Sequence, residues 1–198
     1  LYPLASLEPL IILCLLITTC TAYLSSYKNA LRDISITLFG FIYIILPLVS
    51  LIKILYAYPA PHEIMGAWLC TYLIAVTKIN DIAAFFIGRK WGKYPLAKKI
   101  SPKKTLEGAL GGFIAAILLS LLFSIYTPVI MSPLSAIFLG ASISIFGQLG
   151  DLAESLFKRD AKVKDSSTLP GLGGFLDILD SLIFTAPLLF LYLNMAQL

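Results

Sequence analysis

Residues 109–130 read ALGGFIAAILLSLLFSIYTPVI, which is 22 positions in a row without a charged side chain. A helix of about 20 apolar residues crosses the hydrocarbon core of a bilayer and satisfies its own backbone hydrogen bonds there. Other stretches of the chain share this character. The sequence therefore predicts six membrane-spanning helices, at residues 7–24, 34–56, 64–88, 109–130, 134–149 and 175–195.

The composition of the whole chain is also that of a membrane protein. Of its 198 residues, 59% are apolar and 13% are charged, and the mean hydropathy is +0.90. A soluble domain has about 25% charged residues, so the composition excludes a globular protein with water all round. We expect an all-α, polytopic integral membrane protein in which residues 1–198 form a single membrane domain without a separate soluble part.

The Lys and Arg residues are concentrated in alternate loops between the predicted spans. Thirteen of the 15 lie in the loops 25–33, 89–108 and 150–174, and the turns 57–63 and 131–133 carry none. Loops rich in Lys and Arg stay on the cytoplasmic side of a membrane. The pattern therefore predicts that the three basic loops, and any polar site between them, face the cytoplasm.

Four carboxylates lie within or at the edge of predicted spans, all toward this basic side. An ionisable group in a membrane usually faces a cavity or a partner, and we expect Asp81 to pair with Lys78. Asp177 and Asp180 are three residues apart and share a helix face, where they repel each other unless a cation lies between them. Together with Asp151 they are expected to converge on a divalent cation such as Mg²⁺, which prefers oxygen ligands.

The segment that joins these carboxylates carries cations and a glycine-rich turn. Glu154 and Lys158 are four residues apart, so they align on a helix, and Arg159 and Lys164 follow. The sequence PGLGG at 170–174 then leads into the last predicted span. Glycines allow backbone N–H groups to approach a phosphate, and a helix N-terminus favours anions. These residues fit a site for a metal-bound polyphosphate, and they fit a solvated loop of mixed charge equally well.

A second basic segment, SPKKTLEG at 101–108, precedes the span at 109–130. Taken alone, it is typical of a cytoplasmic loop that attracts anionic lipid headgroups. Ser101 or Thr105 could cap the helix that follows, with Glu107 in its first turn.

Taken in order, these motifs resemble the signature of the phosphatidate cytidylyltransferase (CDP-diacylglycerol synthase) family. The resemblance runs from about Asn80 to the C-terminus and is strongest over residues 147–181. There the chain has GQLGDLAES at 147–155, Lys158-Arg159, KDSS at 164–167 and PGLGGFLDILDS at 170–181. The segment SPKKTLEG and Asn80-Asp81 match motifs that lie upstream in the family.

The resemblance implies an enzyme of phospholipid biosynthesis that uses CTP, Mg²⁺ and phosphatidate, or a similar anionic lipid, to form CDP-diacylglycerol and pyrophosphate. It implies a homodimer in the bacterial inner membrane with its site facing the cytoplasm, and no nucleic-acid partner is expected. By motif position, Asp151, Asp177 and Asp180 are the metal ligands and, with Lys158, the catalytic residues. The substrate-binding residues implied are Ser101, Lys103, Lys104, Glu107, Ser155, Arg159, Lys164, Asp165, Gly173 and Gly174. Because the chain begins at Leu1 and not at Met, we expect N-terminal spans of the family to be missing, with the motif-bearing part at 80–181.

The signature departs from the family at two positions: Leu172 replaces a His and Ile178 replaces an Arg. Losing a polar contact in a dry site costs about 2–4 kcal/mol of transition-state stabilisation, so the sequence predicts impaired activity. Two alternatives to the phosphatidate enzyme therefore stay open. One is a related CTP-dependent lipid enzyme, either a prenyl-lipid cytidylyltransferase or a polyprenol kinase. The other is an inactive homologue that serves as a membrane partner.

Overall fold

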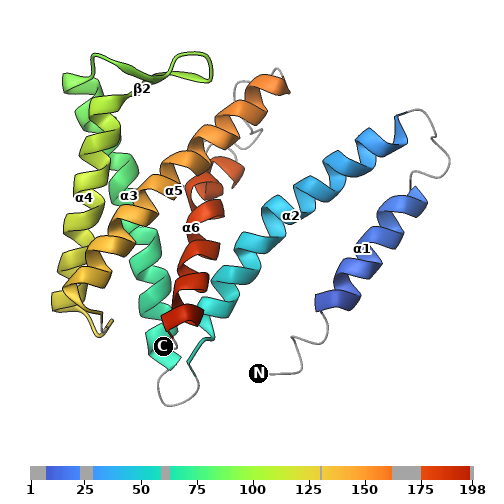
Figure 1. Ribbon diagram of the computed structural model, residues 1–198, viewed down its shortest axis with the longest axis horizontal. Helices are drawn as coiled ribbons and strands as arrows, with labels where there is room; N and C mark the ends of the chain where they lie inside the picture. Colours follow the sequence, from blue (N-terminus) through green and yellow to red (C-terminus); the bar gives the residue numbers. More distant parts are fainter. Residues whose placement is uncertain (1–7, 23–28, 59–62, 130, 162–174, 197–198) are drawn as a thin grey trace. The chain divides into compact units, whose positions relative to one another are not determined.

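The computed structural model describes residues 8–22, 29–58, 63–129, 131–161 and 175–196 (Figure 1). In order along the chain, these form α1 (Glu8–Ala22), α2 (Ala30–Leu55), α3 (Glu63–Trp91), β1 (Pro95–Ala97), β2 (Ser101–Thr105), α4 (Leu106–Tyr126), α5 (Pro133–Asp160) and α6 (Phe175–Ala196). The chain divides into two compact units, Leu1–Leu46 and Pro47–Leu198. The second unit holds the whole motif-bearing part, and the site is built within it.

Five of the predicted spans are confirmed by the length and composition of the helices. Within the described residues, the helices α2 to α6 are long and apolar enough to cross a membrane, so the protein is an all-α polytopic membrane protein. The first span, expected at 7–24, stays a prediction, because the structure describes only its 15-residue part α1 and residues 7, 23 and 24 lie outside the described residues. The helix α5 continues through the polar segment to Asp160, since DLAESLFKRD keeps helical spacing and ends in basic side chains that suit a helix C-terminus.

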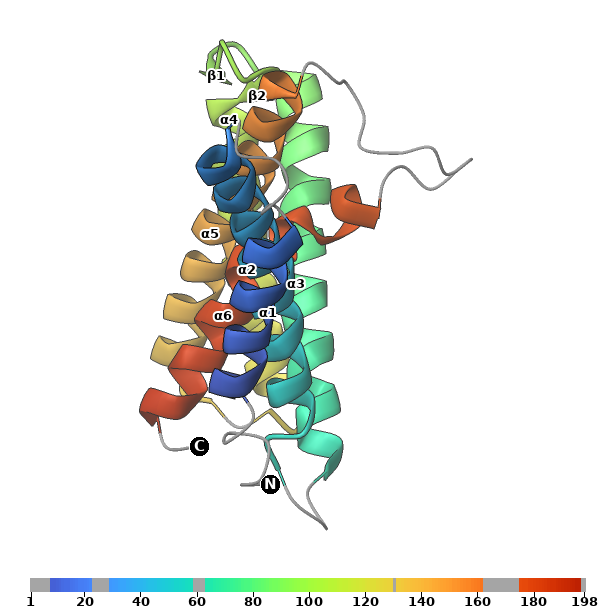
Figure 2. The same ribbon diagram turned by 90° about the vertical axis from the view of Figure 1, so that its right-hand side faces the viewer.

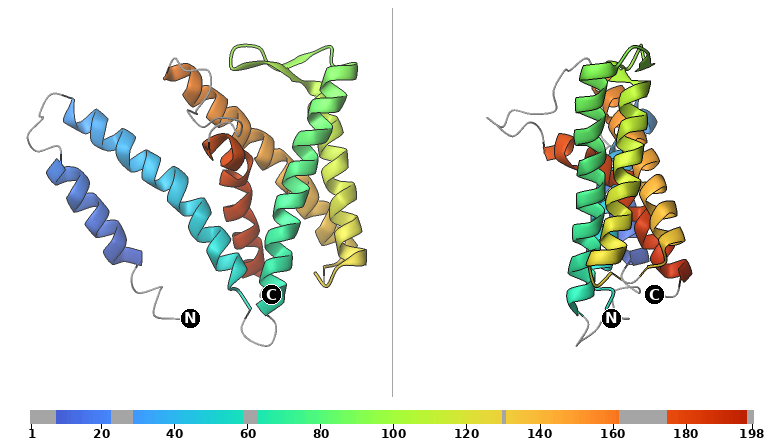
Figure 3. Two further views of the ribbon diagram at one scale, coloured as in Figure 1. Left: turned by 180° about the vertical axis from the view of Figure 1, so that it is seen from behind. Right: turned by 90° about the vertical axis from the view of Figure 1, so that its left-hand side faces the viewer.

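Close approach of backbones holds the second unit together. The helices α3 and α4 lie side by side, and α4 packs against α5, which packs against α6 (Figure 3). A Cβ on Gly112 of α4 would lie 2.7 Å from the backbone oxygen of Asn80 on α3. Between α4 and α5, a Cβ on Gly140 would lie 2.9 Å from the Cα of Ile117. Small residues therefore set the helix spacing, as is common where lipid on all sides removes the hydrophobic drive for association.

Polar side chains inside the bundle are paired across helices. The hydroxyl groups of Tyr72 on α3 and Ser120 on α4 share a hydrogen bond of 2.7 Å, and the Ser120 hydroxyl also lies 2.6 Å from the backbone oxygen of Ala136 on α5. Around them lies an apolar core that includes Leu73, Val76, Leu139, Ile143 and Leu189. Buried hydroxyls in a membrane interior need such partners, so this chain of bonds fixes the register of three helices.

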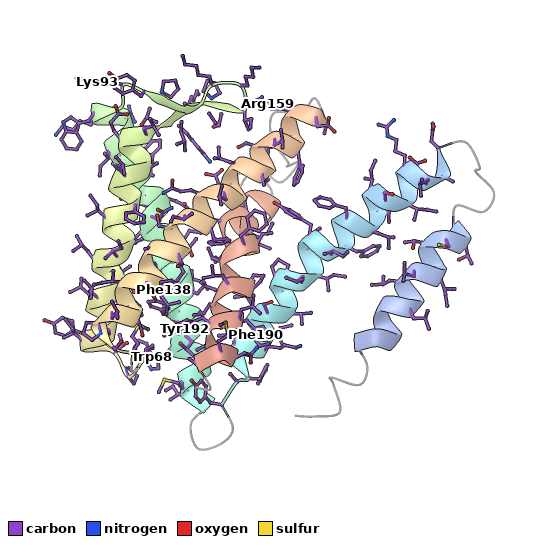
Figure 4. The ribbon with its side chains drawn as sticks, in the orientation of Figure 1. Trp68, Lys93, Phe138, Arg159, Phe190 and Tyr192 are labelled. Carbon is purple, nitrogen blue, oxygen red and sulfur yellow. The ribbon has the colours of Figure 1, made fainter. Side chains whose placement is uncertain are left out.

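Aromatic side chains gather at the end of the bundle where α3 begins and α6 ends. Trp68, Phe138, Phe190 and Tyr192 lie there, and the rings of Phe138 and Tyr192 have centroids 6.5 Å apart (Figure 4). Aromatic residues are enriched where a membrane meets water. They mark the interface opposite the basic end.

The basic loop between α3 and α4 contains a β-hairpin, an element that the sequence analysis did not predict. The strands β1 and β2 are antiparallel, with Pro95 opposite Thr105 and Ala97 opposite Ser101. Thr105 caps α4, as predicted: its hydroxyl accepts a hydrogen bond from the Gly108 N–H at 3.2 Å. Figure 2 shows the hairpin at the end of the unit where α5 also ends.

We predict that Gly112→Ala destabilises the protein by about 1–3 kcal/mol, because the added methyl group meets the backbone and side-chain oxygens of Asn80. Thermal unfolding of purified protein in detergent measures the change. Gly40→Ala on α2 is the matched control, since a Cβ there has nothing within 4 Å and alanine favours a helix. Equal effects of the two substitutions would contradict the close packing of α3 on α4.

Candidate metal and substrate site

Three carboxylates from two helices meet at the basic end of the second unit. Asp151 and Glu154 of α5 and Asp180 of α6 each offer an oxygen, and these oxygens lie within 4.8 Å of one another. Glu154 and Asp180 are buried, and Asp151 is half-buried. Gly150 makes this meeting possible, because any side chain at that position would collide with the backbone oxygen of Asp180. We refer to Asp151, Glu154 and Asp180 as the carboxylate cluster.

Two lysines neutralise part of the charge of the carboxylate cluster. Lys104, from β2, forms an ion pair with Asp151, and its ammonium nitrogen is buried. Lys158 donates to the Oε2 of Glu154 at 2.9 Å, which is the pairing that their spacing predicts. Asp180 accepts a hydrogen bond from the Ser181 N–H at 2.5 Å. The cluster is therefore tied to the hairpin as well as to its own helices.

A fourth carboxylate, Asp81 of α3, lies next to the cluster and has its own partners. Its Oδ2 is 3.6 Å from the Lys78 ammonium nitrogen, so the predicted pairing is confirmed. The Ser181 hydroxyl donates to the same oxygen at 3.2 Å and accepts from Lys78 at 3.3 Å. This triangle of side chains joins α3 to α6 directly beside Asp180.

An amide network lies on the α5 side of Asp81. The side-chain oxygen of Asn80, a buried residue, accepts from the Ser144 hydroxyl at 2.6 Å and from the Gln148 amide at 3.2 Å. Gln148 also donates to the backbone oxygen of Ala109 at 3.1 Å, and Asn80 donates to Asp81 at 3.2 Å. Since these bonds connect α3, α4 and α5, they hold Asp81 and Asp151 at fixed positions on neighbouring helices.

Asn80, Asp81, Gln148 and Asp151 line a cavity of about 620 Å³, a volume within the range of small-molecule binding sites. The cavity lies between α3, α4, α5 and the hairpin, and its wall is both charged and apolar. Its lining residues are Asn80, Asp81, Ala84, Phe85, Gly88, Arg89, Leu96, Ser101, Lys103, Lys104, Thr105, Gly108, Ala109, Gln148 and Asp151. Cations from the hairpin and carboxylates from α3 and α5 thus line the same cavity, so it offers partners for both a phosphate and a metal ion.

The structure brings some of the predicted substrate residues to this cavity. Ser101, Lys103 and Lys104 line it. Glu107 instead supports the base of the hairpin, where its carboxylate accepts from the Tyr94 N–H at 3.3 Å. Arg159 lies at the exposed end of α5, where its Nε donates to the backbone oxygen of Ile100 at 3.3 Å (Figure 4).

The remaining predicted residues lie on α5 or outside the described part of the chain. Ser155 is half-buried on α5, one turn after Asp151. Lys164, Asp165, Gly173 and Gly174, together with Leu172, lie outside the described residues. The helix α6 includes Asp177 and Ile178, but the structure describes only its backbone at these two positions, so the predicted approach of Asp177 to Asp151 stays a prediction.

One member of the carboxylate cluster, Glu154, and several residues of the cavity wall, Gln148 and Arg89 among them, were not among the predicted site residues. The sequence analysis assigned Glu154 to Lys158 alone, although Glu154 follows Asp151 at the same three-residue spacing that singled out Asp177 and Asp180. That spacing was the available signal. Gln148 lies within the motif GQLGDLAES, which was the available signal for it, whereas Arg89 is one cation of a basic loop and gave no signal; only the packing of α3, α4 and α5 brings both residues to one cavity.

Comparison with known proteins adds an independent observation. The sequence model of the cytidylyltransferase family matches residues 3–196. The phosphatidate cytidylyltransferase of Chlamydia pneumoniae is 38% identical over 175 residues, which are 85% of this chain and 57% of that protein. That of Bacillus subtilis is 41% identical over 123 residues, 62% of this chain and 46% of its own length. YnbB, an uncharacterized protein of Escherichia coli K12, is 45% identical over 131 residues, 65% of this chain and 43% of its own. The chain spans about half the length of the curated relatives it matches.

The site geometry predicts that Asp180→Asn lowers the affinity for a divalent cation at least about tenfold, because it removes one of three charged oxygen ligands. Mn²⁺ binding to the detergent-solubilised protein, followed by electron paramagnetic resonance, measures this affinity. Asp160→Asn serves as the control, since that carboxylate is exposed at the end of α5. Unchanged Mn²⁺ affinity in Asp180→Asn would exclude the carboxylate cluster as a metal site.

Proposed function

The chain belongs to the cytidylyltransferase family, and from that premise we propose that it is a CTP:phosphatidate cytidylyltransferase. The reaction joins CMP to phosphatidate, giving CDP-diacylglycerol and pyrophosphate. One observation carries the proposal: the carboxylate cluster lies at a cavity whose wall combines Asp151 of the cluster with the cations of the basic hairpin. A phosphoryl transfer between two anionic substrates needs both kinds of charge at one place.

The carboxylate cluster suits a hard divalent cation, and Mg²⁺ is the ion we propose. Its three oxygens are within reach of a single ion, and three ligands leave coordination positions for phosphate oxygens. Asp151, Glu154 and Asp180 would hold the ion, with Asp177 as a further proposed ligand. When bound, it would offset the negative charge of the CTP phosphates.

In the proposed reaction, the nucleophile comes from the lipid. A phosphatidate oxygen attacks the α-phosphorus of CTP, a new P–O bond forms, and the bond from the α-phosphorus to the bridging oxygen of the β-phosphate breaks. The electron pair leaves with pyrophosphate. No side-chain nucleophile is needed, so the task of the protein is to position both phosphates and to balance their charge. Arg89, Lys103 and Lys104 on the cavity wall suit that task.

Apolar side chains of the same wall suit the lipid substrate. Phe85 is exposed on α3, and Ala84 and Leu96 line the cavity beside it. We propose that the lipid enters from the bilayer while CTP enters from water. The protein is an integral membrane protein. By the distribution of Lys and Arg, we propose that it lies in the bacterial inner membrane with this site facing the cytoplasm. The homodimer implied by the family resemblance is part of the same proposal.

Leu172 and Ile178 favour a second candidate, an inactive homologue that serves as a membrane partner. Both replace polar residues of the family signature with apolar side chains, which can neither donate a hydrogen bond to a phosphate nor order a carboxylate. The carboxylates proposed to hold the metal ion and the basic side chains of the wall are present in the sequence, however, so we favour a weak enzyme over an inactive one.

The proposal predicts that the double substitution Leu172→His and Ile178→Arg raises the rate of CDP-lipid formation. Restoring polar contacts worth about 2–4 kcal/mol corresponds to roughly 30- to 1,000-fold in rate. Asp180→Asn should abolish the activity of the parent protein. The assay measures labelled CTP incorporated into lipid extracts with phosphatidate and Mg²⁺ in one detergent.

Three results of this assay would count against parts of the proposal. If the double substitution brings no gain over an active parent, Leu172 and Ile178 are harmless. If no variant forms product although all bind CTP, the protein is a partner and not an enzyme. If phosphate is transferred from CTP to a polyprenol and no CMP reaches phosphatidate, the related lipid kinase is the better description.

A further inference from the structure

Two of the three members of the carboxylate cluster form ion pairs with lysines. Lys104 pairs with Asp151 and Lys158 pairs with Glu154. Lys158 sits on the same helix four residues after its partner, so helix geometry alone sets that contact. Lys104 is different, because it comes from β2 and contacts Asp151 on α5, a separate element.

A divalent cation at the carboxylate cluster would compete with Lys104 for Asp151. An ammonium group and a metal ion on one carboxylate repel each other strongly where little water separates them. The Lys104 nitrogen is buried, and a buried charge without a partner is costly. Lys104 therefore needs another anion once the ion arrives.

The cavity offers a place for that anion. Ser101, Lys103 and Lys104 line it together, so a phosphate there would meet at least two cations of the hairpin. The base of the hairpin is fixed by the cap at Thr105 and by the bond from Tyr94 to Glu107. With the strand fixed, the four-carbon side chain of Lys104 can turn from Asp151 toward the cavity while the backbone stays in place.

We propose that Lys104 is a positioning residue that changes partner during binding, from Asp151 in the metal-free protein to a phosphate of the nucleotide when the metal ion and CTP are bound. The inference rests on the proposed function for the identity of the triphosphate. It assigns Lys104 two opposite effects. Lys104 weakens the binding of a divalent cation alone, and it strengthens the binding of the cation–nucleotide complex.

The substitution Lys104→Met should change the affinity for the cation alone and the affinity for the cation–nucleotide complex in opposite directions. The variant should bind Mn²⁺ alone about tenfold more tightly, because a competing charge is gone, and Mn²⁺–CTP about tenfold more weakly, because a phosphate partner is gone. Mn²⁺ affinity is measured by electron paramagnetic resonance and CTP affinity by equilibrium dialysis, both on the full chain in detergent. Lys99→Met, an exposed lysine at the turn of the same hairpin, should change neither affinity more than twofold. Lys104→Arg should restore both toward the parent values.

A second measurement needs no variant. Amine-reactive labelling of the parent protein, read by mass spectrometry, should increase at Lys104 on addition of Mn²⁺ alone and decrease when CTP is added as well. Labelling at Lys99 should stay constant in all three conditions.

The outcomes separate this inference from the proposed function. If Lys104→Met weakens both affinities or changes neither, or if labelling at Lys104 ignores Mn²⁺, the exchange of partners is wrong even where CDP-lipid is formed. If Lys104→Met binds Mn²⁺ more tightly and Mn²⁺–CTP more weakly, but the parent forms no CDP-lipid, the exchange of partners is supported and the proposed reaction is wrong. If the parent binds Mn²⁺ but no CTP, both are overturned.

Discussion

Three carboxylates held within a few ångströms of one another at the edge of a bilayer are the feature on which the rest of the site depends. Asp151, Glu154 and Asp180 repel each other, and each buried charge needs compensation. The close backbone contact at Gly150 brings α5 and α6 near enough for these carboxylates to repel one another. Lys104 and Lys158 reduce the repulsion by pairing with Asp151 and Glu154. The cluster keeps a net negative charge, which favours the binding of a cation.

The polar residues behind the cluster show how a membrane bundle can keep such a site in place. The helices α3 and α4 approach closely through small residues, and the network around Asn80 links them to α5. The triangle of Lys78, Asp81 and Ser181 links α3 to α6. Each bond satisfies a group that would be costly to leave unpaired away from water, so the network positions the helix ends while it stabilises the bundle.

The hairpin gives the site its second kind of charge. It carries cations toward the cavity on one strand, and its tip is joined to the end of α5 through Arg159. A flexible basic loop could attract anions equally well, but it could not hold a lysine against a particular carboxylate. The strand pairing and the cap at Thr105 restrict the backbone so that Lys104 has a defined reach.

The sequence by itself determined the class of the protein and most of the chemical groups of the site. Uncharged runs such as 109–130 require membrane helices, because a helix pairs all the backbone N–H and C=O groups of its own segment, which have no water to bind in lipid. The local pairs Lys78–Asp81 and Glu154–Lys158 follow from helical spacing, as does the cap at Thr105. The ordered motifs also indicated the family.

Only the tertiary structure decided which of these groups meet. Glu154 joins Asp151 and Asp180 because Gly150 lets two backbones touch, and a distance between helices cannot be derived from the spacing within one. Residues 95–105 form a hairpin whose strands pair with each other, while Tyr94 just before it bonds to Glu107 of α4 and Ile100 at its turn bonds to Arg159 of α5. The charge pattern alone carries no information on such contacts. Lys104 faces Asp151 although 46 positions separate them in the chain, since contacts between distant segments depend on how whole helices pack.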